Sequence, residues 1–171
     1  MSKQNQKLRV LISLASPLYT GPAEPLISIG RFLSKQGHQI RFAIDLARNG
    51  DLAQRLQEKN LQIIKSVALS TKSGPLTIVR DILVLHREVQ AGLDLWFANF
   101  SHDHALASLC LGARTKRNTM LVRAIQGNNS AKKRPFQKFA YQRTNGFVFP
   151  CRSLQNKLRQ NYGVERCRTT V

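Results

Sequence analysis

The feature that most constrains the fold is an apolar run that ends at a glycine turn and continues into a helical pattern. Residues 8–15 read LRVLISLA, which is typical of a strand buried on both faces. Gly21 can turn the chain sharply, and Pro22 suits the first helical position because its missing N–H would be unpaired there. This stretch therefore predicts a strand, a glycine turn and a helix in succession.

The predicted helix has a clear apolar face and a clear end. Leu26, Ile29, Gly30 and Leu33 recur at the three-and-four spacing of one helical face. Gly37 supplies the left-handed residue that commonly ends a helix. The segment is therefore expected to pack one face against the preceding strand.

The same alternation continues along the chain. Further strands are predicted near residues 38–45, 61–64, 93–99, 118–125, 146–149 and 168–171, and helices near 50–60, 74–92, 101–113, 136–143 and 151–163. Alternating strands and helices favour an α/β fold whose parallel sheet has helices on both faces. We predict one Rossmann-like three-layer domain over residues 1–171, with a mostly parallel sheet of six or seven strands.

Three of the predicted helices carry an apolar stripe that indicates which side packs on the sheet. Ser101 is expected to cap the second of them. The stripes are Val79, Ile82, Leu83 and His86; Leu106, Leu109, Cys110 and Ala113; and Leu154, Leu158 and Tyr162.

The charge of the chain is strongly positive and unevenly distributed. Lys and Arg number 27 against 9 Asp and Glu, and residues 101–171 hold 14 of the basic residues with only 2 acidic ones. Such a surface attracts nucleic acid, anionic lipid headgroups and phosphorylated sugars alike. Neither a membrane-spanning stretch of about 20 apolar residues nor a signal peptide is found. We therefore expect a cytoplasmic protein, with room for a peripheral position on the inner face of the cytoplasmic membrane.

Motifs for metals and common cofactors are missing from the sequence. The three cysteines have no CxxC spacing, and neither GxGxxG nor GxxxxGK[ST] occurs. His102 and His104 lie two positions apart at a predicted helix start, so their side chains diverge. No metal and no cofactor is predicted, and His102 is expected either to hydrogen-bond a substrate or to act as a polar helix cap.

Ligands of parallel sheets bind beyond the carboxyl ends of the strands, and this rule sorts the loops. The Gly21 turn, the SHDH segment and the basic loop 132–134 fall on that side, whereas residues 114–117 fall on the opposite side. A helix N-terminus at Gly21 favours an anion such as phosphate, although a plain tight turn is the alternative.

Four segments together resemble the N-terminal domain of a family 4 glycosyltransferase of the GT-B class, over nearly the whole chain. The turn Gly21-Pro22-Ala23-Glu24 resembles the Gly-Gly-x-Glu loop that lies near the donor diphosphate in this family. The four segments are RVLISLASPLYTGPAEPLISIGRFLSKQGHQIRFA, DLWFANFSHDHALASLCLGA, LVRAIQG and FQKFAYQRTNGFVFPCRSLQNKLRQNYGVERCRTTV.

The resemblance implies the acceptor-side half of a retaining transferase. Such an enzyme would move a sugar from a nucleotide-diphosphate donor to a glycan or glycolipid acceptor, lipid-linked or polysaccharide, at an anionic membrane surface. The family's nucleotide-binding second domain, with its paired glutamates, is absent from the 171 residues, so we expect the chain alone to be inactive. The resemblance places Gly21 and Ala23 near the donor diphosphate. It places these residues near the acceptor: His102, Gln126, Asn128, Lys132 and Lys133.

Three positions depart from the family pattern. Pro22 stands in place of a second glycine, Gln126 in place of a frequent histidine, and Cys151 in place of a usual serine. No catalytic nucleophile is assigned to the chain. The alternative interpretation is a non-catalytic basic module that binds nucleic acid or an anionic surface. No specific nucleic acid is expected, because DNA-binding helix pairs, aromatic RNA-binding strands and zinc spacings are all missing.

Overall fold

The computed structural model describes residues 7–70, 72, 74–112, 119–127, 135–163 and 168–170. Within these ranges, seven parallel strands form one sheet in the order β3-β2-β1-β4-β5-β6-β7. The strands are β1 (Arg9–Leu14), β2 (Gln39–Ile44), β3 (Gln62–Ile63), β4 (Leu95–Ala98), β5 (Met120–Ala124), β6 (Gly146–Val148) and β7 (Arg168–Thr170). The predicted Rossmann-like α/β fold with a parallel sheet is confirmed.

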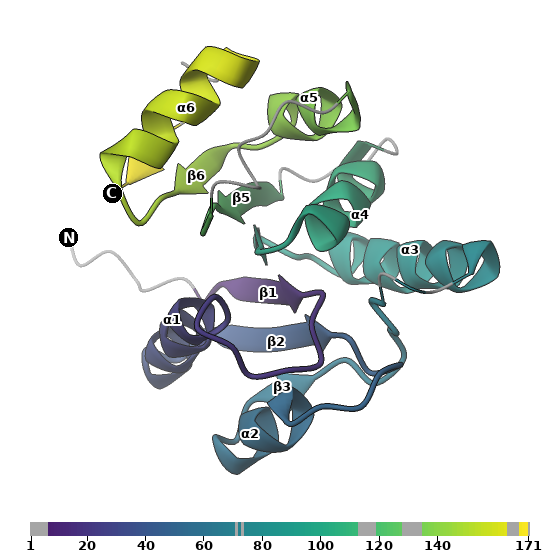
Figure 1. Ribbon diagram of the computed structural model, residues 1–171. Helices are drawn as coiled ribbons and strands as arrows, with labels where there is room; N and C mark the ends of the chain where they lie inside the picture. The colour runs from purple at the N-terminus through teal and green to yellow at the C-terminus, as the bar shows by residue number, and fades with distance from the viewer. Residues whose placement is uncertain are drawn as a thin grey trace.

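Helices connect successive strands and cover both faces of the sheet (Figure 1). The chain steps from β1 to β3 in one direction, and α3 then carries it back to β4, which lies beside β1. The helices are α1 (Glu24–Lys35), α2 (Leu52–Glu58), α3 (Pro75–Gln90), α4 (Ser101–Gly112), α5 (Pro135–Gln142) and α6 (Arg152–Tyr162). None of them, within the ranges given above, combines the length and the apolarity needed to cross a bilayer.

Alternate residues of β1 supply the two cores on opposite faces of the sheet. Val10, Ile12 and Leu14 belong to the cluster beneath α1 and α2, whereas Leu11 belongs to the cluster beneath α3 and α4. This division follows from the two-residue period of a strand, whose side chains point alternately to the two faces. It explains why residues 8–15 carry an almost unbroken apolar run.

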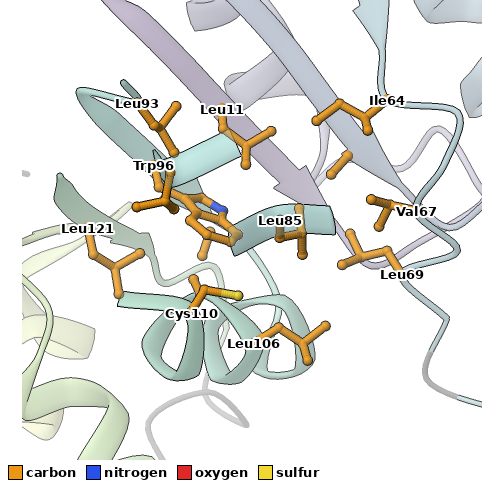
Figure 2. Packing of buried hydrophobic residues seen from close by; sticks show 14 of the residues in the cluster. Leu11, Ile64, Val67, Leu69, Leu85, Leu93, Trp96, Leu106, Cys110 and Leu121 are labelled. Carbon is orange, nitrogen blue, oxygen red and sulfur yellow. The ribbon is translucent and has the colours of Figure 1, made fainter. Parts of the chain in front are cut away.

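The core beneath α3 and α4 is built around Trp96 of β4 (Figure 2). Leu85 of α3 and Cys110 of α4 pack toward its indole ring from the helix layer. The indole N–H donates to Ser13 Oγ at 2.9 Å, and Ser13 Oγ donates to the Phe97 carbonyl oxygen at 3.2 Å. The one polar atom of this large buried ring is thus hydrogen-bonded, as burial requires.

A third cluster fastens α5 and α6 to the distal part of the sheet. The predicted stripe of Leu154, Leu158 and Tyr162 is confirmed as the buried face of α6. Tyr162 packs edge-on against Tyr141, with ring centroids 4.6 Å apart. Gly163, at φ 62°, ends the helix in the left-handed conformation that glycine adopts without a steric cost.

The predicted start of the first helix was wrong by a few residues. Helix α1 begins at Glu24 with Pro25 in its first turn, and Pro22 belongs to the preceding turn. Either proline satisfies the rule that a helix tolerates a missing N–H in its first turn, so composition alone could not choose between them.

The predicted core face of α3 was also wrong. Val79 and Leu83 are 54% and 57% exposed, and the buried residues are Asp81, Leu85 and Val89. Ile82 packs partly against the core, and His86 Nδ1 lies 3.2 Å from the Cys110 carbonyl oxygen. The helix is apolar on two sides, so periodicity identified a stripe without showing which side the sheet covers.

Two expectations for α4 also need correction. Leu109 is exposed, and the buried apolar residues of this helix include Leu106, Ala107 and Cys110. The helix begins at Ser101 itself, whose Oγ accepts a hydrogen bond from Gln137 Nε2 at 3.2 Å. Ala113 of the predicted stripe lies outside the described residues.

Gly30 provides a test of how tightly α1 packs on the sheet. A Cβ at this position would lie 2.7 Å from Phe42 Cζ and 3.0 Å from Ile12 Cδ1, and both neighbours are fully buried. We expect Gly30→Ala to lower the free energy of unfolding by about 1–2 kcal/mol, despite the better helix propensity of alanine. Urea unfolding measures this value.

Gly21→Ala is the matched control, because an added Cβ there meets no atom within 4 Å. We expect it to change stability by less than about 0.5 kcal/mol. Equal effects of the two substitutions would contradict the close approach of α1 to β1 and β2.

Candidate functional site

The topology has a switch point at the carboxyl edge of the sheet, where a ligand crevice is expected. From β1 the chain turns toward β2 through α1 on one face, whereas β4, the other neighbour of β1, leads into α4 on the opposite face. Loops that leave adjacent parallel strands in opposite directions leave a gap between them, and ligands of such sheets bind there. The β1–α1 loop with Gly21 and the β4–α4 loop with His102 flank this gap.

Asn99 ties the two loops together. Its side-chain Nδ2 donates to the Pro22 carbonyl oxygen at 3.2 Å, and its backbone N–H donates to Asp103 Oδ2 at 3.0 Å. Asn99 is 3% exposed, and its buried Oδ1 has no hydrogen-bond partner in the part of the chain that the structure describes. Sequence reasoning missed this residue, although a polar side chain that ends the apolar run LDLWFAN was a usable signal.

The Gly21 turn uses its own backbone donors internally. The N–H groups of Ala23 and Glu24 both donate to the Thr20 carbonyl oxygen, at 2.8 and 3.3 Å. Pro22 and Pro25 have no N–H, and Glu24 brings a negative charge to the first turn of α1. The N-terminus of α1 therefore offers an anion few free donors.

Gly21 nevertheless leaves open space at the crevice. It is exposed, its φ lies outside the left-handed region, and an added Cβ would meet no atom within 4 Å. Neither the turn nor the packing therefore requires glycine here. Ala23, in contrast, is fully buried in the core beneath α1, so only its backbone can lie near a ligand.

His102, in the first turn of α4, is half-buried. Its Nε2 is itself buried and has no hydrogen-bond partner among the described residues. Burial lowers the pKa of this histidine, while the carboxylates of Asp81 and Asp45 act in the opposite direction. The lowered pKa favours the neutral imidazole at pH 7.

The carboxylate of Asp81 holds the β3–α3 loop in place beside His102. It accepts hydrogen bonds from the backbone N–H groups of Ala68 and Leu69, at 2.9 and 2.8 Å. Leu69 is a non-glycine residue at φ 48°, a conformation that needs such support. The backbone of Ala68 and Leu69 is therefore held by two hydrogen bonds at the carboxyl edge of β3.

Gln126 and Gly127 follow β5, the next strand along the sheet, and both are half-buried. Gly127 resembles Gly21 in that an added Cβ would meet no atom of the described residues within 4 Å. The structure thus brings Gly21, His102 and Gln126 to the same edge of three adjacent strands. Asn128, Lys132 and Lys133 lie outside the described residues, as do Arg134 and residues 114–117.

A buried ion pair lies beneath this edge. Arg123 Nη1 of β5 and Asp103 Oδ1 of α4 are 3.9 Å apart, and both side chains are completely buried. Burial raises the pKa of Asp103 to about 6, although Arg123 and the hydrogen bond from Asn99 N–H act to lower it. Burial likewise lowers the pKa of Arg123, with Asp103 and Tyr141 opposing the shift. The attraction between the two groups therefore does not fully offset their desolvation.

His104 and Thr144 continue this polar layer between α4 and α5. His104 Nε2 lies 2.8 Å from Thr144 Oγ1, and the imidazole packs 5.2 Å from the Tyr141 ring centroid. Burial holds the pKa of His104 well below its usual range, and Arg123 acts in the same direction. His104 therefore has a structural role, and it lies on a different side of α4 from His102. No group of three His, Cys, Asp or Glu side chains in the described part of the chain could hold a metal ion.

The raised pKa of Asp103 predicts a pH effect on stability. A carboxyl group with a folded-state pKa of about 6 and a model-peptide value of 3.8 contributes most below pH 3.8. This contribution is lost as the pH rises through about 6. Asp103→Asn removes the titrating group, so the unfolding free energy of the variant minus that of the wild type should grow by about 1–3 kcal/mol between pH 4 and 7. Urea unfolding at several pH values tests this, and a constant difference would contradict it.

Solved structures of three glycosyltransferases share this fold. A glycosyltransferase from Rickettsia africae superposes with a TM-score of 0.73 at 16% identity, covering 96% of this chain and 42% of its own. Anabaena HepE, solved with UDP and glucose, gives a TM-score of 0.69 at 14% identity, with 95% and 44% covered. Acinetobacter baumannii MurG gives 0.61 at 12% identity, with 83% and 41% covered. The fold is that of the GT-B glycosyltransferases, and the chain spans less than half the length of these structures.

The family to which the chain belongs is shown by its sequence. No curated protein matches the chain in sequence. The sequence profile described as Glycosyltransferase Family 4, however, matches residues 23–171, a range that begins just before α1 and includes every later helix and strand. The chain therefore belongs to Glycosyltransferase Family 4.

Proposed function

We propose that this chain is the acceptor-side domain of a retaining glycosyltransferase that moves a sugar from a nucleotide-diphosphate donor to a lipid-linked or polysaccharide acceptor. The observation that carries the proposal is the unfilled space at Gly21, which lies at the switch-point crevice of a family 4 domain. The fold would tolerate a side chain at Gly21. The absence of one allows a large ligand to come close to the backbone of the turn.

The donor diphosphate would lie against the backbone of Gly21 and Ala23. Because the Ala23 N–H already donates to Thr20, the turn would contribute shape more than hydrogen bonds. Most of the donor would be held by a second, nucleotide-sugar-binding domain that acts together with this one. That HepE was solved with UDP and glucose supports a nucleotide-diphosphate sugar as the donor class.

The acceptor would lie between the α4 and α5 sides of the crevice. His102 lies in the first turn of α4, and a rotation of its side chain would bring the buried Nε2 of its neutral imidazole toward an acceptor hydroxyl group. Gln126 at the end of β5 offers an amide for the same purpose. Asn128, Lys132 and Lys133 would continue this surface and bring a positive charge toward an anionic membrane.

No residue of this chain is proposed to form a covalent intermediate. In the proposed reaction the rate comes from positioning the two substrates and from stabilising the charge of the departing diphosphate. The role of this domain is to orient the acceptor and to shape one side of the donor site. The buried Asp103–Arg123 pair and Asn99 would act only through the position of the loops.

Substitution of Gly21 tests the donor site. We expect Gly21→Val to leave stability within about 0.5 kcal/mol of the wild type, since Gly21 is exposed and a Cβ there would meet no described atom within 4 Å. It should weaken the binding of UDP or GDP by about tenfold, because the side chain would occupy the volume proposed for the diphosphate. NMR titration of the chain with each nucleotide measures the affinity.

Gly74→Val provides the matched control, because Gly74 also meets no neighbour within 4 Å but lies before α3. Its nucleotide affinity should equal that of the wild type. Unchanged affinity in Gly21→Val, or an equal loss in both variants, would exclude the proposed position of the diphosphate.

Activity of the isolated chain is a separate test. Because the nucleotide-sugar-binding domain is proposed to be a distinct unit, the 171 residues alone should show no transfer from radiolabelled UDP- or GDP-sugars to lipid or polysaccharide acceptors. Measurable turnover by the chain alone would overturn the proposed division of labour.

A further inference from the structure

A cavity of about 460 Å³ lies at the amino edge of the sheet, where β1, β2 and β3 begin. In Figure 1 the arrows of β1 and β2 point away from this edge. The volume is within the range of sites that hold small molecules. The proposed donor and acceptor site lies at the opposite edge, where the same strands end, so the cavity is separate from it.

The strand register gathers polar side chains on one face of the sheet at this edge. Arg9 of β1 pairs with Gln39 of β2. Arg41, two residues further along β2, pairs with Gln62 of β3. Side chains at paired positions, and at positions two apart on one strand, project from the same face. The next residue of β1 on this face is Leu11, which is buried in the core beneath α3 and α4, so the polar set lies just beyond that core.

Two loops complete the wall of the cavity. Ser34 and His38 come from the end of α1 and the loop before β2, and Asn60 comes from the loop before β3. His38 Nδ1 accepts a hydrogen bond from the Leu8 backbone N–H at 3.3 Å, so the neutral imidazole carries its proton on Nε2. The wall therefore offers hydroxyl, imidazole and amide groups, which suit a ligand that carries hydroxyl groups.

The charge of the cavity wall is positive. Arg9 and Arg41 line it, and no Asp or Glu is among the described residues that do so. Two carboxylates nearby are engaged: Glu88 pairs with Arg41, and Asp94 accepts the backbone N–H of Arg9 at 2.8 Å. The Arg9 guanidinium donates to the Ala91 carbonyl oxygen. Each of these guanidinium contacts uses Nη1, and a guanidinium has five N–H donors, so both arginines keep donors for an anion.

We propose that this cavity binds a phosphorylated monosaccharide of hexose size. The phosphate lies against the guanidinium groups of Arg9 and Arg41, whose forked donors match phosphate oxygens. The sugar hydroxyl groups meet the amides of Gln39 and Gln62 and the imidazole of His38. The inference does not rest on the proposed function, because the cavity and the switch point lie at opposite edges of the sheet.

NMR titration with glucose 6-phosphate and glucose 1-phosphate tests both the ligand and its position. At least one of them should shift the amide signals of Gln39, Leu61 and Gln62 more than those of Gly21 and His102 at the carboxyl edge. It should bind about tenfold more tightly than glucose or inorganic phosphate, because each of these supplies only part of the contacts. The absence of a saturable shift, or shifts confined to the carboxyl edge, would overturn the proposal. Equal affinity for inorganic phosphate would do the same, since the sugar would then contribute nothing.

Removal of one guanidinium group tests the phosphate contact. Arg9→Gln should weaken binding of the better sugar phosphate by about tenfold, as expected for the loss of a charge-assisted hydrogen bond. Arg31→Gln is the matched control, because Arg31 is exposed on α1 and does not line the cavity. An equal loss in the two variants would indicate a diffuse positive field and exclude the proposed site.

An added carboxylate tests the same point without removing any contact of the fold. Ser34 is exposed at the end of α1 and lines the cavity, so Ser34→Glu should also weaken binding of the sugar phosphate by about tenfold through repulsion. Ser28→Glu adds the same charge at an exposed position of the same helix outside the cavity, and it should change the affinity less than about twofold. Circular dichroism checks that each variant is folded. Unchanged affinity in Ser34→Glu, or equal losses in both serine variants, would overturn the proposal.

Discussion

Burial of β1 on both faces is the constraint on which the rest of the structure depends. Side chains at alternate positions of this central strand enter two separate cores, so helices must cover both sides of the sheet. Since β2 and β4 flank β1 and lead to helices on opposite faces, the strand order reverses at β1. The switch point at Gly21 and Asn99, where ligands of such sheets bind, is a direct result of that reversal.

Polar groups beneath the crevice give it a defined shape at an energetic cost. Asp103 holds the backbone of Asn99, which in turn holds the carbonyl group of Pro22, so one buried carboxylate positions the loops on both sides of the gap. Its neighbour Arg123 is fully buried, and none of its three guanidinium nitrogens meets hydrogen-bond geometry within the described residues. A buried ion pair of this kind adds little stability, because the cost of desolvation offsets most of the attraction between the two charges.

The glycines illustrate how structure separates packing from function. Gly30 is required because the ring of Phe42 lies where a Cβ would be, whereas Gly21 has no such neighbour and no left-handed backbone. Both look alike in the sequence, as small residues near an apolar helical face. The proposal for the donor site depends on this difference.

The sequence by itself determined the order of strands and helices, the parallel sheet and the family, because these depend on local periodicity, turn residues and motif order. It also placed Gly21, His102 and Gln126 at one edge, since the carboxyl ends of parallel strands coincide. Only the tertiary structure decided which side of α3 is buried. Both apolar faces of this helix show the same periodicity in the sequence, so periodicity cannot identify the buried face. It also decided that Asn99 bridges the crevice and that Asp103 meets Arg123. Those contacts join residues on different elements, and their partners are selected by the packing of the layers and not by spacing along the chain.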